Sequence, residues 1–145
     1  MLISLRQKEV AMRYAIDILK KKPRTFNYIE PDAKVSDALS LLSSMNRSFL
    51  VVMKGNQFNG IFSEREFIRN LTLGGKDTNC RVETVMNSSL PVVSADTPVE
   101  EVIMLFHIHH VNYLPVFEEG RFEGIITLHN IMKMLCEEKG YVFEN

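Results

Sequence analysis

Apolar residues recur at helical spacing in two separate segments of the chain. In each segment the spacing is i, i+3, i+4 and i+7, which places four apolar side chains on one face of a helix. The residues are Val35, Ala38, Leu39 and Leu42, and then Val99, Val102, Ile103 and Phe106. The pattern therefore predicts one amphipathic helix in each segment.

A pair of short apolar runs follows each of these helices. The runs span 49–53 and 58–62 in the first case, and 113–117 and 122–126 in the second. Runs of this length, rich in valine and aromatic residues and separated by a glycine-containing turn, are typical of buried β-hairpins. Shorter runs at 26–29 and 91–94 predict one further strand ahead of each helix.

A second helix is predicted after each hairpin, beginning at Ser63 or Thr127. Ser63 and Glu66 have the spacing of a capping box, and so do Thr97 and Glu100 at the start of an earlier helix, with Pro98 as its first residue. We expect an inward-facing set in both final helices, namely Phe67, Ile68, Leu71, Ile131, Met132 and Leu135.

These elements form an internal repeat. Residues 28–72 align with 92–136 without a gap at an offset of 64, and nine of the 45 pairs are identical, including Gly60 with Gly124. Residues 16–19 also resemble 83–86, after a shift of three residues. The sequence predicts a mixed α/β (α+β) fold of two strand-helix-strand-strand-helix motifs, packed with pseudo-twofold symmetry. The chain is expected to divide into an N-terminal helix at 1–14, a first motif at 15–78 and a second motif at 79–145. The amphipathic pattern of the N-terminal helix runs from Leu5 to Lys20 and so continues into the first motif.

Composition excludes several classes of function. The 145 residues carry 17 Lys and Arg against 18 Asp and Glu, so a net charge of −1 gives no reason to seek nucleic acid or an acidic membrane. No apolar run approaches the roughly 20 residues that span a bilayer, and the start lacks the pattern of a secretory signal. We therefore expect a cytoplasmic protein.

Catalytic and metal-binding patterns are also missing from the sequence. Two cysteines form neither a disulfide framework nor a zinc motif, and of the three clustered histidines only His107 and His110 share a helix face. No nucleophile elbow or Walker loop is present. We expect no metal, no catalytic cofactor and no enzyme activity.

Three segments resemble the CBS domain, which is named after cystathionine β-synthase. They are the Leu-Pro-Val strand at 114–116, the stretch 60–66, and the stretch 82–86. Two such domains in tandem would make a Bateman module. The resemblance implies a regulatory protein that binds an adenosine-containing ligand (AMP, ADP, ATP, an S-adenosyl compound or NAD) in clefts between the motifs. It also implies a homodimer that signals by conformational change, through an effector protein where one exists.

The family signature is Gly-hydrophobic-x-Ser/Thr-x-x-Asp, in which the Asp contacts ribose hydroxyls. The matching stretches run from Gly60 to Glu66 and from Gly124 to Asn130, so Glu66 and Asn130 stand where Asp is usual. For Ser63 and Glu66, ribose contact and simple helix capping are both open. Asn130 can donate and accept hydrogen bonds without a charge, and we slightly favour the Thr127–Asn130 cleft.

The resemblance also implies which residues complete each cleft. One cleft would join Thr127 and Asn130 to Thr25, Phe26 and Asn27, and the other would join Ser63 and Glu66 to Met86, Leu90 and Pro91. Ile61, Ile125 and Leu90 would sandwich the purine or serve simply as core.

Phosphate contacts are expected to be weak. The His-Arg pair of some family members is absent, and its substitutes, or alternatively plain surface charges, would be Arg47, Arg65, His110 and His129. Weak phosphate contact favours AMP or an adenosyl compound over ATP, and we expect AMP as the regulatory ligand. The competing hypothesis is a purely structural dimerisation module whose clefts are closed by their own side chains.

Overall fold

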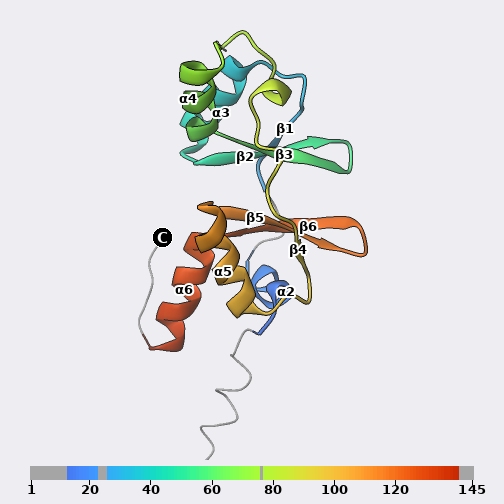
Figure 1. The fold of residues 1–145 in the computed structure, drawn as a ribbon, viewed down its shortest axis with the longest axis vertical. Helices are drawn as coiled ribbons and strands as arrows, with labels where there is room; N and C mark the ends of the chain where they lie inside the picture. The colour runs from blue at the N-terminus through green and yellow to red at the C-terminus, as the bar shows by residue number, and fades with distance from the viewer. Residues whose placement is uncertain (1–12, 23–25, 76, 141–145) are drawn as a thin grey trace, which may run out of the picture. The chain divides into compact units, whose positions relative to one another are not determined.

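The computed structural model describes residues 13–22, 26–75 and 77–140 (Figure 1). The chain divides into two compact units. A continuous unit spans Thr25–Leu90, and a split unit combines Met1–Arg24 with Pro91–Asn145. Among the described residues, no helix has the length and apolar character that crossing a bilayer requires.

The continuous unit is a three-stranded sheet with two helices. Its elements are β1 (Tyr28–Ile29), α3 (Val35–Met45), β2 (Phe49–Lys54), β3 (Gln57–Ser63), α4 (Glu64–Leu73) and the 3-10 turn η1 (Val82–Thr84). The sheet has the order β1-β2-β3, with β1 parallel to β2 and β2 antiparallel to β3. The helical stripe is buried against the strands in a core of Val35, Ala38, Leu42, Leu50, Val52, Phe62, Val82 and Val85.

The split unit repeats this plan. Its elements are α2 (Ala15–Lys20), β4 (Val93–Ser94), α5 (Val99–His109), β5 (Tyr113–Glu118), β6 (Arg121–Thr127) and α6 (Leu128–Glu138). The sheet order is β4-β5-β6, again with one parallel and one antiparallel pair. In both hairpins the register shifts at the same place, after Val52 in β2 and after Val116 in β5. The sequence repeat is thus a structural repeat, and the predicted mixed α/β fold is confirmed.

A lead segment, which is residues 82–87 for one unit and helix α2 for the other, packs against each sheet, and in both cases it comes from outside the matching sequence repeat. Residues 82–87 precede β4 in the chain, yet they pack in the continuous unit, where Ile61 and Asn87 form a β-bridge. Helix α2 precedes β1, yet it packs against β6 in the split unit. The resemblance between 16–19 and 83–86 therefore reflects two equivalent positions in the two units.

Several local expectations are wrong. Thr97 does not cap α5, because its Oγ1 accepts the Ser94 N–H (3.1 Å) and closes a turn, and Pro98 is the N-cap instead. In the final helices, Ile131 is buried, but four residues expected to face the core are exposed: Ile68, Leu71, Met132 and Leu135. Most of the predicted helix from Leu5 lies outside the described residues, and α2 begins at Ala15.

Candidate functional site

Two equivalent glycines mark the point where each lead segment meets its sheet. A Cβ atom on Gly60 would lie 2.6 Å from the backbone oxygen of Asn87 and 3.2 Å from the Met86 sulfur. Gly124 has φ +151°, and a Cβ there would lie 3.2 Å from Cδ2 of Leu19 on α2. A side chain at Gly60 would meet backbone atoms, whereas at Gly124 it is the positive φ that favours glycine, because the nearest atom is the flexible end of Leu19.

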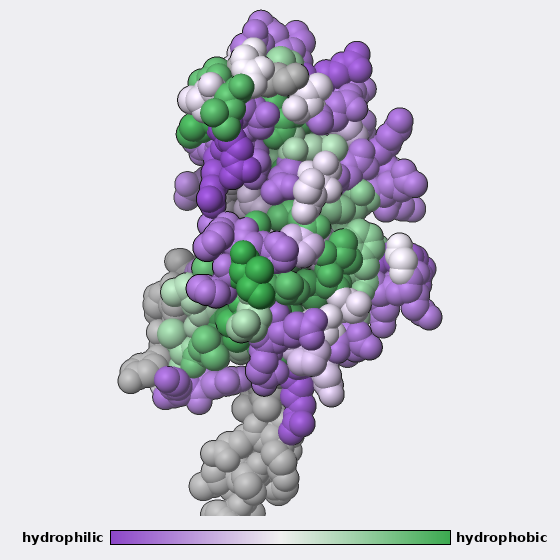
Figure 2. All heavy atoms as spheres, viewed as in Figure 1, coloured by the Kyte–Doolittle hydropathy of each residue, from purple (hydrophilic) through white to green (hydrophobic). Residues whose placement is uncertain are grey.

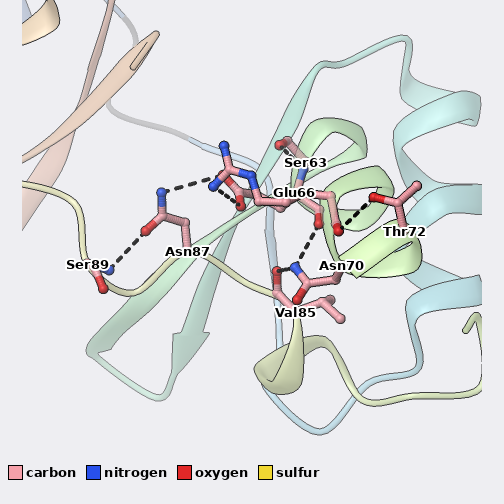
Figure 3. A network of polar contacts seen from close by, with 8 residues as sticks. Ser63, Glu66, Asn70, Thr72, Val85, Asn87 and Ser89 are labelled. Carbon is pink, nitrogen blue, oxygen red and sulfur yellow. Dashed lines mark hydrogen bonds and ion pairs between the residues drawn. The ribbon is translucent and has the colours of Figure 1, made fainter. Parts of the chain in front are cut away.

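In the continuous unit, this approach places the lead segment beside the start of α4. Ser63 is the N-cap of α4, and its Oγ accepts the backbone N–H of Glu66 (3.3 Å). The Glu66 side chain is buried, with 8% of its surface exposed. Its Oε2 accepts the Asn87 amide (3.4 Å), and its Oε1 lies 3.7 Å from the Arg69 guanidinium (Figure 3).

Further polar contacts hold the lead segment in place. Backbone hydrogen bonds join Ile61 and Asn87 in both directions (3.0 and 2.8 Å). The Asn70 amide donates to the Glu66 carbonyl (2.8 Å) and to the Val85 carbonyl (3.3 Å), as Figure 3 shows. The first turn of α4 and residues 85–87 are therefore linked by side chains as well as by the sheet.

The two possible capping boxes differ in where the side chain of the third helical residue is directed. Ser63 Oγ accepts the Glu66 N–H as a capping box requires, whereas the Glu66 carboxylate contacts Asn87 and Arg69. At Thr127 and Asn130 the reciprocal box is formed, with Asn130 N donating to Thr127 Oγ1 (3.1 Å) and Thr127 N donating to Asn130 Oδ1 (2.9 Å).

Lys22 completes the equivalent position in the split unit. Its ammonium donates to the Ile125 carbonyl (2.9 Å) and to Asn130 Oδ1 (3.0 Å). Burial lowers the pKa of Lys22 below its usual 10.5, because desolvation disfavours the charged form. In each unit, the third residue of the final helix is thus contacted by a polar side chain, from Asn87 in the continuous unit and from Lys22, two residues after α2, in the split unit.

The structure brings together part of each predicted cleft. In the continuous unit, Met86 lies against Gly60, Ser63 contacts Glu66, and Ile61 and Leu90 are buried. Phe26 and Asn27 belong to the same unit, where Asn27 O accepts the Val51 N–H, whereas Thr25 lies outside the described residues. Ile125, Thr127, Asn130 and Pro91 belong to the split unit. Each predicted cleft combines residues of both units, so both clefts stay predictions.

The four suggested phosphate contacts, Arg47, Arg65, His110 and His129, are all exposed. His107 and His110 have ring centroids 6.4 Å apart. Over the described ranges, no three metal-ligating side chains come close enough to hold an ion.

Sequence reasoning missed Lys22, Asn87, Arg69 and Asn70. A weak signal existed for Asn87, which directly follows the family-like stretch 82–86. No signal distinguished Lys22 from Lys20 and Lys21, because its partners lie 103 and 108 positions away in the sequence.

Comparison with known proteins gives consistent matches. The family model of the CBS domain matches residues 15–73 and 82–137. The CBS domain-containing protein YhcV of Bacillus subtilis (strain 168) is 23% identical over 119 residues, or 81% of this chain and 85% of YhcV. An inosine-5'-monophosphate dehydrogenase of Staphylococcus saprophyticus is 28% identical over 113 residues, which are 74% of this chain but only 22% of the dehydrogenase. The crystal structure of CBSX2 in complex with AMP has a TM-score of 0.73 and 25% identity, and the match covers 88% of this chain and 99% of that one.

Proposed function

Because the chain belongs to the CBS-domain family, we propose that it is a regulatory module that binds an adenosine-containing ligand, with AMP as the first candidate. CBSX2, which shares its fold, is known in complex with AMP. The observation that carries the proposal is the buried Glu66 carboxylate, which contacts Asn87 of the lead segment.

The surroundings of Glu66 suit a partner that donates hydrogen bonds. A carboxylate offers about four acceptor positions. Here Asn87 supplies a long hydrogen bond of 3.4 Å, and Arg69 lies at 3.7 Å. These contacts leave acceptor capacity for the two hydroxyls of a ribose, which is the role that the family signature gives to the acid at this position.

The same contacts connect ligand binding to conformation. A ribose that bonds to Glu66 competes with Asn87, whose backbone is hydrogen-bonded to Ile61. Binding would therefore favour states in which residues 85–89 are held differently, and a ligand shifts an equilibrium only through such differential affinity. An effector protein that contacts this segment would sense the change.

Thermal unfolding with AMP, ADP, ATP, NAD and S-adenosylmethionine tests the proposal, with GMP as a control for the base. A ligand of the folded state raises the midpoint, by the equivalent of about 2.7 kcal/mol at a concentration of 100 Kd. Glu66→Gln should weaken the active ligand by roughly tenfold, and Glu64→Gln, an exposed change in the same helical turn, should leave it unaltered. If none of the five compounds moves the midpoint, the proposal fails.

The exposed apolar residues support assembly into a homodimer. Seven of the twelve exposed large hydrophobic residues among the described residues lie on α4 (Ile68, Leu71, Leu73), α5 (Met104, Ile108) and α6 (Met132, Leu135), and Figure 2 shows apolar residues on the surface over α4. Isologous contact between two copies would remove these side chains from water. Light scattering at tens of micromolar should give the mass of a dimer, and Leu71→Glu should shift it toward the monomer while Thr72→Glu, on the same helix, should not.

A further inference from the structure

Helix α5 ends in a pair of histidines that the repeated fold does not require. The equivalent helices α3 and α5 have 11 residues each, and each ends in a left-handed C-cap with φ 52°, at Asn46 and at His110. Asparagine is a usual residue at such a helix end. His107 lies one turn before His110, and its equivalent in α3 is Ser43. The continuous unit therefore forms the same helix end without either histidine.

The two imidazoles lie close enough to share a metal ion. His107 and His110 are both exposed, and their ring centroids are 6.4 Å apart. A zinc ion lies about 3.2 Å from the centroid of an imidazole that ligates it, so two rings on one ion have centroids about 5.2 Å apart at the tetrahedral angle and about 6.4 Å apart when they face each other. A closing movement of about 1.2 Å (6.4 − 5.2), which a change of side-chain rotamer provides, gives tetrahedral geometry.

The charges around this helix end favour a cation. The last carbonyl groups of a helix have no partner within the helix and carry partial negative charge. No lysine or arginine lies between Arg81 and Arg121 in the sequence, whereas this stretch holds six acidic residues: Glu83, Asp96, Glu100, Glu101, Glu118 and Glu119. The stretch includes β4, α5 and β5, so no lysine or arginine of these elements opposes a cation at the end of α5.

We infer that His107 and His110 bind a divalent transition-metal ion of the zinc class, with water completing its coordination. Imidazole nitrogen suits zinc, nickel and copper, whereas magnesium and calcium take oxygen ligands. Two protein ligands make a weaker site than the three or four of the usual zinc centre, so the ion is exchangeable. His109 lies two residues from His107, on a different side of the helix, and is outside the pair. The inference replaces the expectation that the protein binds no metal, and it does not depend on the proposed function.

Isothermal titration calorimetry with Zn²⁺ tests the site, on the untagged full chain with Cys80 and Cys136 replaced by serine so that no thiol competes. This reference chain should bind Zn²⁺ saturably and should not bind Mg²⁺. His107→Gln and His110→Asn should each weaken zinc binding by about tenfold or more, because one of two protein ligands is lost. His110→Asn recreates the helix end of α3, so the fold should be kept. His109→Gln is the matched control on the same helix and should bind zinc as the reference does.

NMR spectroscopy of the imidazole groups locates the bound ion. On addition of Zn²⁺ to the reference chain, the ring signals of His107 and His110 should shift together and saturate, while those of His109 should stay in place. The absence of saturable zinc binding, or equal weakening by His109→Gln and His107→Gln, would overturn the inference. The NMR titration needs no histidine variant, so it decides the question even if a substitution disturbs the end of α5.

Discussion

Replacing Gly60 by alanine would place a methyl group 2.6 Å from the backbone oxygen of Asn87. Ordinary van der Waals contact begins near 3.4 Å, so the two backbones must separate by about 0.8 Å (3.4 − 2.6). The obstacle is a backbone carbonyl rather than the end of a flexible side chain, and it cannot be avoided by a change of rotamer.

The cost follows from the two hydrogen bonds that cross this point. Their lengths of 3.0 and 2.8 Å would become about 3.8 and 3.6 Å if the separation lay along them, beyond the range of a useful bond. Losing both costs about 1–3 kcal/mol. Alanine restricts the unfolded chain and returns about 0.4–1 kcal/mol. Subtracting the midpoints of these two ranges, we expect Gly60→Ala to lower the free energy of unfolding by about 1.3 kcal/mol (2 − 0.7).

Urea unfolding measures the total loss of stability in Gly60→Ala, and hydrogen exchange shows which residues lose protection. The amides of Ile61 and Asn87 should lose protection in Gly60→Ala, while amides in the middle of β5 should exchange as before. Asn87→Ala is the matched control, because it removes the contact with Glu66 and keeps both backbone bonds. A loss below about 0.5 kcal/mol with unchanged protection at Ile61 and Asn87 would refute the argument.

Three further predictions concern other parts of the fold. Asn130→Ala removes one half of the capping box of α6 and should lower the free energy of unfolding, measured with urea, by about 0.5–2 kcal/mol. An unchanged free energy of unfolding would show that this hydrogen bond does not stabilise the fold. Phe62→Ala removes a fully buried ring and should cost about 3–5 kcal/mol, and a cost below that of Asn130→Ala would contradict this core assignment. Burial lowers the pKa of Lys22, so between the folded pKa and the usual 10.5 the unfolded chain binds more protons than the folded chain, and the free energy of unfolding should rise with pH. Lys22→Met should abolish this rise. An equal rise in the variant would contradict the burial of Lys22.

Much of the fold could be predicted because its signals are local. The two hairpins were predicted from short apolar runs with turn residues between them. In the structure, each of their four strands is longer than predicted by at most one residue at either end. The helix stripes beginning at Val35 and Val99 are likewise buried as the spacing indicated. In these elements each residue's environment depends on neighbours a few positions away.

The remaining features depend on contacts that are distant in sequence. Helix α4 carries apolar residues on more than one face, so periodicity alone did not show that Ile68 and Leu71 are exposed. The spacing of Ser63 and Glu66 satisfied a capping rule, but Asn87, 21 positions away, draws the carboxylate aside. Sequence also gave no means of placing α2 on β6 rather than on β3.

The exchange of lead segments has a kinetic consequence during synthesis. Helix α2 leaves the ribosome about 100 residues ahead of β6, a delay of roughly 5–20 s at about 5–20 residues per second. Meanwhile β2 and β3 emerge, and the position on β3 that belongs to residues 82–87 is vacant. Helix α2 resembles that segment and buries Ala15, Ile18 and Leu19 in the finished protein, so it is a ready competitor for the vacancy. Nascent chains paused when β3 has emerged from the ribosome but residues 82–87 have not should therefore hold α2 in a non-native pairing, which must dissociate before the split unit can form.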